Sequence, residues 1–462
     1  MDAEQKTLLH HNQFIHYVCL VFISMLIGII TALIAIAFIY SYKFFHNLFF
    51  YGTFSFAYDP NTFAKASYLG AGIIFIPTIG AIIVTFLITH FSYDAKGSGI
   101  PQVMKSIVLK KLVISPIVGI IKFISSSISL GSGGSIGIEG PITLIGGSIG
   151  SQFSRLKSFC LKEKRALIAA GAASGIATVF DTPFAGFLFA MELLLVKTES
   201  KNLLPLAISV ATAYYTSNYF SIIHPFLVNK THLSLEQLSL SYLSSMHFYE
   251  IFLLIILGII SGAVSIIFIK TLYFIEDIFN KFSNNYYIRH AVAMFIVGIM
   301  LYLFMKYTGN YHIQGVSHAT IIEICLNSIT NPIFLILLFG GKFLATCLTL
   351  GTGASGGVFS PTLFMGACVG GLYAILLQYF LPNIDINISY YVLAAMAGML
   401  SGVTGAVLTS IIMTIELSNN LGIVIYVLIS SITAYFIRKL FCYDNVYTLN
   451  LRRQGVNYPY SL

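Results

Sequence analysis

Three short glycine-rich segments, each running into a proline, contain the residues of this sequence that are best placed to do chemistry. They read GSGIP at 97–101, GIEGP at 137–141 and GVFSP at 357–361. Proline suits the first turn of a helix because its missing amide would be unpaired there, and glycine lets the backbone bend and approach a ligand closely. Each segment therefore predicts a helix that begins inside apolar sequence, with unpaired amides and the positive end of the helix dipole at its start.

Helix starts of this kind favour anions, and amides placed in hydrocarbon must face protein, water or an ion. None of the three segments contains Lys or Arg, so a site built from them would attract an anion without a full positive charge that slows its release. The alternative is that these glycines only allow helices to cross closely. Because the pattern occurs three times, we favour an anion pathway.

Three side chains could complete this site. Glu139 stands at an amide-rich break, where its carboxylate could occupy the place of an anion and be displaced by the anion or by protonation. The alternative role for Glu139 is to cap its own helix. Ser98 adds a hydroxyl donor, and Tyr447 could add a phenol from the C-terminal end, although such a tyrosine is also typical of a membrane interface.

The elements that must hold these residues are membrane-spanning helices. Of the 462 residues, 57% are hydrophobic and 9% are charged, whereas about 25% are charged in an ordinary soluble domain. This composition excludes a soluble globule, a disordered chain and a nucleic-acid-binding protein. Apolar stretches such as 15–38, 166–195 and 390–417 predict an all-α, polytopic membrane protein with roughly ten to fourteen crossings, some of them partial.

The chain contains an internal repeat. Residues 122–150 match residues 342–370 without a gap, with 10 of 29 positions identical. A weaker match of GAASG at 171–175 with GMLSG at 398–402 extends the repeat and pairs Glu192 with Glu416. We interpret Glu192 and Glu416, and likewise Lys122 and Lys342, as structural counterparts in two related halves.

The distribution of charge predicts how the two halves are oriented. Eight Lys and Arg residues lie in the flanks of the first copy, at 105–111 and 155–165, and none lies in the flanks of the second, at 320–331 and 371–385. Because cytoplasmic flanks attract positive charge, the halves should be inverted, with the substrate site between them near the midplane. The expected organisation is a cytoplasmic N-terminus at 1–15, a first repeat at 16–223, an external loop at 224–249, a second repeat at 250–447 and a cytoplasmic C-terminus at 448–462.

The three segments in this order, with GGVFSP at 356–361 and VYTLNLRR around Tyr447, resemble the CLC family of chloride channels and chloride/proton antiporters. The resemblance covers nearly the whole chain. It implies a homodimer with one anion pathway in each subunit, in a bacterial inner membrane with both termini cytoplasmic, and the compact form without CBS domains. It also implies that Glu139 is the external gate. The expected anion-binding positions are Ser98, Ile100, Gly137, Ile138, Val358, Phe359, Ser360 and Tyr447.

The chain departs from the family pattern at two positions. Ile138 stands where the gate motif usually has Lys or Arg, and Leu193 stands where proton-coupled members commonly carry an internal acidic residue. A leucine cannot relay a proton. We therefore favour passive, gated chloride conduction; the alternative is chloride/proton exchange by another internal route, such as water or Glu192. Bound chloride ions are expected, with no cofactor and no metal.

One alternative from a different class is an intramembrane serine hydrolase. The segment GASG at 353–356 matches a pattern for a buried nucleophile, with Ser355 as the nucleophile. A base would have to come from His290, His312 or His318. Against this, Ser355 is matched by Ser135 in the other copy of the repeat, which indicates a backbone role rather than an enzyme.

Overall fold

The computed structural model describes residues 3–109, 112–156, 159–195, 200–220, 227, 248–456 and 458. Within these residues the protein is helical, and its one β-type pairing is an isolated bridge. Seven of the described helices are long and apolar enough to cross a membrane. The prediction of an all-α, multi-pass membrane protein is confirmed.

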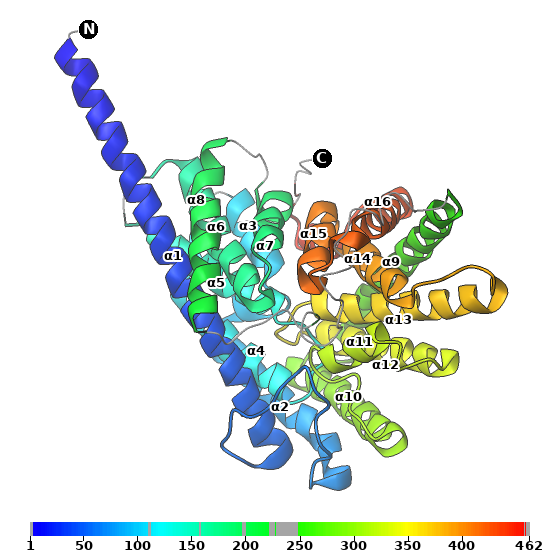
Figure 1. Ribbon diagram of the computed structural model, residues 1–462. Coiled ribbons are helices and arrows are strands. Elements are labelled where there is room, and N and C mark those ends of the chain that lie inside the picture. Colours follow the sequence, from blue (N-terminus) through cyan, green and yellow to red (C-terminus); the bar gives the residue numbers. More distant parts are fainter. Residues whose placement is uncertain are drawn as a thin grey trace.

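The first half contains eight α-helices within the described residues (Figure 1). They are α1 Ala3–Tyr51, α2 Ile76–Phe91, α3 Ile100–Val108, α4 Pro116–Gly131, α5 Glu139–Phe153, α6 Leu161–Phe180, α7 Pro183–Phe189 and α8 Ser200–Tyr219. A short π-helical turn, Ala190–Leu194, follows α7. The helix α1 is continuous from Ala3, so helix extends through the segment expected to form the N-terminal tail.

The second half contains the remaining described α-helices. They are α9 Phe248–Phe282, α10 Tyr286–Thr308, α11 His318–Cys325, α12 Pro332–Gly351, α13 Phe359–Phe380, α14 Ile388–Thr404, α15 Val407–Ser418, α16 Val424–Phe441 and α17 Val446–Arg453. The expected external loop at 224–249 lies outside the described residues, apart from Leu227 and the first two residues of α9.

Helix packing in one half is repeated in the other. In the first half α1 packs on α8, α5 on α6 and α6 on α8; in the second, α9 packs on α16, α13 on α14 and α14 on α16. Figure 1 shows the first half on one side of the molecule and most of the second half on the other. The pore-loop segments 135–141 and 355–361 meet between them, as the bridge and hydrogen bonds below show.

Equivalent residues of the two repeats contact each other across a local twofold axis. Gly137 and Gly357 form the isolated antiparallel bridge, in which each amide donates to the other's carbonyl at 2.9 and 2.8 Å. The hydroxyls of Ser135 and Thr346 share a hydrogen bond of 3.0 Å, and their counterparts Ser355 and Ser126 share one of 2.8 Å. Gly137 and Gly357 are repeat mates that run antiparallel, and the repeat exchanges the other two pairs with each other, so the halves are inverted, as the flanking charges predict.

Two apolar stretches that looked continuous in the sequence are broken in the structure. The stretch 166–195 divides where Asp181 takes a left-handed conformation with φ of 56°, and α7 begins at Pro183. The stretch 390–417 divides at Gly405, with φ of 77°, before α15 begins at Val407. Hydropathy could not reveal these breaks because both sides of each one are apolar.

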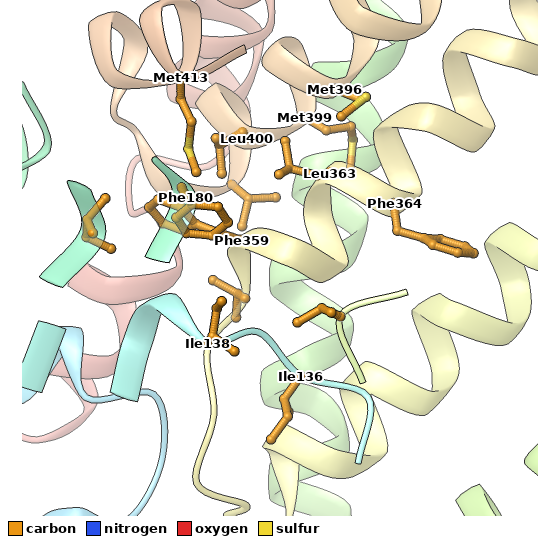
Figure 2. Packing of buried hydrophobic residues seen from close by; sticks show 14 of the residues in the cluster. Ile136, Ile138, Phe180, Phe359, Leu363, Phe364, Met396, Met399, Leu400 and Met413 are labelled. Carbon is orange, nitrogen blue, oxygen red and sulfur yellow. The ribbon is translucent and has the colours of Figure 1, made fainter. Parts of the chain in front are cut away.

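Apolar side chains from both halves pack around the pore loops. Figure 2 shows Phe359 close to Phe180, Leu363 and Leu400, from helices of both repeats, with Ile138 on the loop below them. The rings of Phe189 and Phe359 are 5.8 Å apart in an edge contact. On this apolar side the loops are shielded from water, so polar groups that face it must find partners in the protein or in a ligand.

Candidate functional site

The three glycine-rich segments start helices, as the sequence predicts. The helix α3 begins at Ile100, α5 at Glu139 and α13 at Phe359. In front of α3, Gly99 has φ of 99°, a conformation that an L-residue adopts only with strain. The starts of these three helices lie next to one another, as the close contacts between their loops show.

Glycine is required where the three loops touch. A Cβ on Gly99 would lie 2.5 Å from the carbonyl oxygen of Gly140, and a Cβ on Gly140 would lie 2.1 Å from the carbonyl oxygen of Ser98. The same Cβ on Gly140 would lie 3.0 Å from Cα of Gly357. Backbone from both repeats therefore converges at a point where larger residues would force the helix starts apart.

The carboxylate of Glu139 caps the helix of the other repeat. Glu139 is fully buried, and its Oε1 accepts a hydrogen bond of 2.5 Å from the amide of Phe359, the first residue of α13. Its Oε2 lies 3.4 Å from the hydroxyl of Ser360. Phe359 is the repeat mate of Glu139 itself, so one repeat supplies an acid and the other supplies the amides that bind it. The carboxylate thus occupies a place suited to a free anion.

A cavity of about 730 Å³ leads to this region, and we call it the Tyr447 cavity. Ser98, Val358 and Tyr447 all line it. Tyr447 is 1% exposed, and its hydroxyl has no hydrogen-bond partner among the described residues. A buried hydroxyl normally has a partner, because leaving it unpaired costs about 1–3 kcal/mol. The hydroxyl of Tyr447 is therefore suited to donate to a ligand such as an anion.

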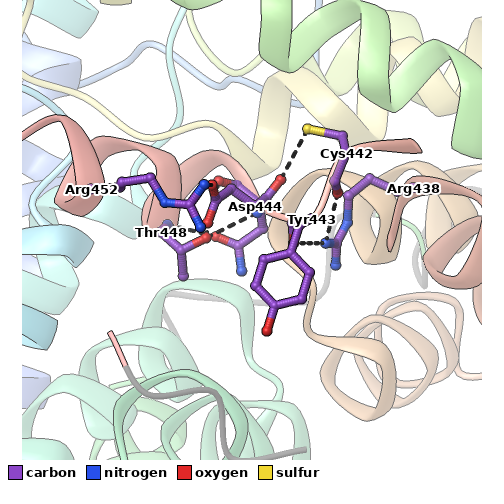
Figure 3. A network of polar contacts seen from close by, with 7 residues as sticks. Arg438, Cys442, Tyr443, Asp444, Thr448 and Arg452 are labelled. Carbon is purple, nitrogen blue, oxygen red and sulfur yellow. Dashed lines mark hydrogen bonds and ion pairs between the residues drawn. The ribbon is translucent and has the colours of Figure 1, made fainter. Parts of the chain in front are cut away.

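A network of polar contacts surrounds the start of α17, the helix that carries Tyr447, and Figure 3 shows part of it. The side chain of Asn445 accepts hydrogen bonds from the amides of Tyr447 and Thr448 at 2.9 and 2.8 Å, while the hydroxyl of Thr448 accepts from the amide of Asn445. Asp444 forms an ion pair of 2.7 Å with Arg452. Buried Arg438 donates to the carbonyl of Tyr443 at 2.8 Å. These contacts fix the start of α17 and therefore the direction of the Tyr447 ring.

The other expected anion-binding residues lie at the helix starts but differ in what their groups can do. Ile100 is the first residue of α3, and Ile138 and Val358 are the N-cap residues of α5 and α13. The amide of Gly137 is already paired with the carbonyl of Gly357. Gly137 therefore joins the two pore loops through its amide, and its place among the anion-binding positions stays a prediction.

Residues 80–439 match the family model described as voltage gated chloride channel. This chain belongs to that family, the CLC family. Its curated relatives include the H⁺/Cl⁻ exchange transporter ClcA of Vibrio cholerae, which is 27% identical over 374 residues. The matched region spans 81% of this chain and 77% of the relative. The corresponding protein of Yersinia pestis is 26% identical over 371 residues, covering 80% of this chain and 75% of the relative.

Solved CLC structures share the fold. A slow cyanobacterial Cl⁻/H⁺ antiporter has a TM-score of 0.78 and 23% identity, with 94% of this chain and 98% of that chain covered. A CLC-type fluoride/proton antiporter has a TM-score of 0.75 and 20% identity, with the same coverage. The family consists of transport proteins, so this CLC protein is not an enzyme.

Ser355 has contacts that leave no role for a nucleophile. Its hydroxyl is buried, bonds to the hydroxyls of Ser125 and Ser126 at 3.0 and 2.8 Å, and donates to the carbonyl of Ala95 at 3.3 Å. The three candidate bases bond elsewhere: His290 to Thr85, His312 to Thr320 and His318 to Asn61. Ser355 therefore links the loops of the two repeats.

The buried lysines each hold one loop in place. The ammonium of Lys122 donates to the carbonyls of Ala95 and Gly97, which precede Ser98. The ammonium of Lys342 donates to the carbonyls of Ile313 and Gly315 at 3.2 and 2.6 Å. The two lysines are structural counterparts in their contacts, and Lys122 positions the loop that carries Ser98.

The lysine contacts reveal a fourth loop that the sequence analysis missed. Residues 315–319, GVSHA, precede α11 as GSGIP precedes α3, and both loops have two left-handed residues. The φ values are 79° and 99° at Gly97 and Gly99, and 54° and 60° at Gly315 and Ser317. In the sequence, only the spacing could have signalled the match, because Gly315 precedes Lys342 by nearly as many residues as Gly97 precedes Lys122.

The two repeat-related glutamates hold helix starts across the axis. The carboxylate of Glu192 accepts from the amides of Leu408 and Thr409 at 2.9 and 2.8 Å, at the start of α15. The carboxylate of Glu416 accepts from the amides of Phe184 and Ala185 at 3.0 and 2.8 Å, at the start of α7. These reciprocal contacts are those of structural counterparts.

Leu193, at the position of the expected internal acid, is enclosed by protein. It lies in the π-helical turn Ala190–Leu194 and is 4% exposed. The hydroxyl of Tyr458 donates to the carbonyl of Leu193 at 2.8 Å. The segment after α17 therefore covers this position, which offers an apolar side chain and no group that could carry a proton.

Proposed function

We propose that this CLC protein transports chloride from the Tyr447 cavity, past Ser98 and Tyr447, to a gate formed by Glu139. The observation that carries the proposal is the hydrogen bond from the amide of Phe359 to the carboxylate of Glu139. An anion crossing this point must take the place of that carboxylate, because both bind the same end of α13. Chloride would be bound by the hydroxyls of Ser98 and Tyr447 on one side of the gate.

Exchange of chloride for protons is the mode of transport that we favour. Protonation removes the charge with which Glu139 binds the amides of α13, so a proton and a chloride ion favour the same displaced state of this side chain. The curated relatives named above are H⁺/Cl⁻ exchange transporters. A side chain that must release amides to let an anion pass, and that takes up a proton when it does so, would couple the two ions.

Passive conduction gated by Glu139 is the second candidate. It is favoured by Leu193, which is buried and cannot carry a proton to the gate. In this mode Glu139 would still be displaced by chloride, but protons would not be moved across the membrane in a fixed ratio with it. The two modes share the same anion pathway and differ only in whether protons reach Glu139 from the side of the Tyr447 cavity.

The oligomeric state, the membrane and the orientation that we propose rest on the family and on the charges of the sequence. We propose a homodimer with one anion pathway in each subunit, in a bacterial inner membrane, with 1–15 and 448–462 on the cytoplasmic side. The excess of Lys and Arg near the first pore loop and the C-terminus supports this orientation. The two repeats would span 16–223 and 250–447, with chloride ions as the bound groups.

The test is chloride efflux from proteoliposomes, with the voltage clamped and the external pH recorded in an unbuffered bath. We expect the wild type to take up protons against their gradient while chloride leaves. Glu139→Gln should keep chloride flux and lose proton uptake, because the amide resembles the neutral acid. Glu323→Gln, a partly exposed carboxylate on α11, is the control and should behave as the wild type.

Each component of the proposal has its own contradicting result. Loss of chloride flux in Glu139→Gln would show that the side chain is not a gate. Chloride efflux without proton uptake in the wild type would exclude exchange and leave passive conduction. No chloride flux in a folded wild type would overturn the anion pathway itself.

A further inference from the structure

Exchange requires a proton route to Glu139 from the side of the Tyr447 cavity, and the enclosed position of Leu193 does not provide one. This inference rests on the proposed exchange. Gln454 lines the Tyr447 cavity and Tyr458, four residues later, covers Leu193, so both features lie at the same end of the molecule. Protons that arrive at this end therefore need a carboxylate other than one near residue 193.

The Tyr447 cavity offers such a carboxylate in Glu276. This residue is on α9 and lies on the cavity wall together with Tyr273, one turn earlier in the helix, and Tyr447. Glu276 is half-buried, whereas Asp94, another acid on the wall, is exposed. Glu276 can therefore meet water in the cavity while remaining close to the protein interior.

A line of groups on the cavity wall leads from Glu276 towards the gate. Glu276, Tyr273, Tyr447 and Val358 all line the Tyr447 cavity, and Val358 directly precedes Phe359, whose amide binds Glu139. The hydroxyl of Tyr273 donates to the carbonyl of Val446 at 2.5 Å, directly before Tyr447 in the chain. Water beside this line can carry protons, because water and hydroxyl groups both donate and accept hydrogen bonds.

Three other acids, Glu192, Glu416 and Asp277, are already engaged. The carboxylates of Glu192 and Glu416 bind the starts of α15 and α7. Asp277, next to Glu276, is paired with Arg453. The charged groups that face Glu276 from neighbouring elements are Lys96 before α3, Arg289 on α10 and Arg453 on α17, and Asp277 is its neighbour on α9 itself. The part of the chain that the structure describes shows no carboxylate hydrogen bond or ion pair for Glu276 comparable to these.

We propose that Glu276 is the proton-exchanging residue of the Tyr447 cavity, and that it replaces the internal acid missing at Leu193. Its carboxylate takes a proton from water in the cavity and passes it, through water beside Tyr273 and Tyr447, to the displaced carboxylate of Glu139. Only O–H bonds form and break, and each proton that Glu276 gains is passed on. Protons and chloride then share one cavity up to Tyr447.

The experiment compares Glu276→Gln, Glu276→Asp and Asp94→Asn with the wild type in the proteoliposome assay, recording chloride and proton flux together. Proton uptake should fall about tenfold or more in Glu276→Gln, while chloride efflux stays within about twofold. Glu276→Asp keeps a carboxyl group and should retain most of the proton uptake. Asp94→Asn removes an exposed acid of the same cavity and is the matched control.

The outcomes separate this inference from the proposed exchange. Unchanged proton uptake in Glu276→Gln, with exchange intact in the wild type, would overturn the role of Glu276 alone. Equal losses of chloride and proton flux in Glu276→Gln would also overturn it, because the residue would then affect anion access or folding. A wild type without proton uptake would overturn the exchange, and this inference with it.

Discussion

The loop before α3 and the loop before α11 have the same backbone design, but only the first reaches the anion cavity. Each has two left-handed residues, Gly97 and Gly99 in one and Gly315 and Ser317 in the other. Each is held by a buried lysine from the following long helix, Lys122 or Lys342. The two repeats therefore share the backbone conformation of this loop and the lysine that holds it.

What differs is the chemistry at the helix start. The first loop carries Ser98, which lines the Tyr447 cavity, whereas the equivalent residue of the second loop is Val316. At the start of α11 the amide of Ala319 donates to the carbonyl of Pro60 at 3.2 Å, and the side chain of His318 bonds to Asn61. The segment after α1 thus occupies the place that a ligand could take at this helix.

Glu139 and Phe359 show the same contrast at the twofold axis. They are repeat mates, yet one supplies a carboxylate and the other supplies the amide that binds it. A symmetric scaffold places helix starts in pairs, and the few side chains that differ between the two repeats decide which start binds an anion. Substitutions at equivalent positions of the loops before α3 and α11 should therefore affect chloride transport unequally. Substitutions of the residues that only join the two repeats should leave chloride flux unchanged in both.

The largest difference in chloride flux between equivalent substitutions is expected at Gly99 and Gly315. Gly99→Ala would place a Cβ 2.5 Å from the carbonyl of Gly140 at φ of 99°, so α3 and α5 would have to move apart. We expect chloride flux to fall more than about tenfold, since helix starts must be placed to within a fraction of an ångström. The measurement is chloride efflux from proteoliposomes with matched protein content.

Gly315→Ala is the matched control. Its φ is 54°, and no atom lies within 4 Å of the added Cβ. The left-handed conformation should lower stability by about 1–2 kcal/mol, measured by thermal unfolding in detergent, while chloride flux stays unchanged. Equal losses of flux in both variants would contradict the difference between the two loops.

A smaller difference, in chloride binding, is expected between substitutions of Lys122 and Lys342. Lys122→Met and Lys342→Met each leave two buried carbonyls without their charged donor, and we expect each to destabilise the protein by about 2–3 kcal/mol. Only Lys122→Met should also weaken chloride binding, because it releases the loop that carries Ser98. Isothermal titration with chloride checks this, and weakening of binding in Lys342→Met alone would contradict it.

The smallest effect on chloride flux is expected for the serines of the scaffold. Ser135→Ala and Ser355→Ala each remove one hydroxyl from a pair that crosses the twofold axis. Ser135→Ala should lower stability by about 1 kcal/mol, and Ser355→Ala by more, about 1–3 kcal/mol, because Ser355 also bonds to Ser125 and Ala95. Neither substitution should change chloride flux. A Ser355→Ala protein with greatly reduced flux, or a wild type that reacts with serine-directed probes, would show that Ser355 does more than join the loops.

The sequence was sufficient to predict the parts of the site that are marked by unusual residues. Proline after glycine located the starts of α3, α5 and α13, and the gap-free repeat paired Gly137 with Gly357 and Lys122 with Lys342. These predictions worked because backbone breaks in apolar sequence need glycine and proline, whatever the rest of the fold does.

The parts that sequence could not predict depend on contacts between distant segments. The loop before α11 contains neither the second glycine nor the proline of GSGIP, so its match to the first loop appears only in its φ values and its lysine. Gly137 was expected among the anion-binding positions, and the pairing of its amide with the carbonyl of Gly357 is a tertiary contact that the sequence does not reveal. Glu276 carries no motif, and its place in the Tyr447 cavity comes from the packing of α9.

The central claim is that one anion binds at the loop before α3, that a second competes with Glu139 for the amide of Phe359, and that the loop before α11 binds none. An anomalous-scattering map of bromide-soaked crystals of the wild type and of Glu139→Gln tests this most directly. We predict a bromide ion between the hydroxyls of Ser98 and Tyr447 in both, and a second one at the amide of Phe359 only in Glu139→Gln. Bromide at the start of α11, or none beside Tyr447, would contradict the account.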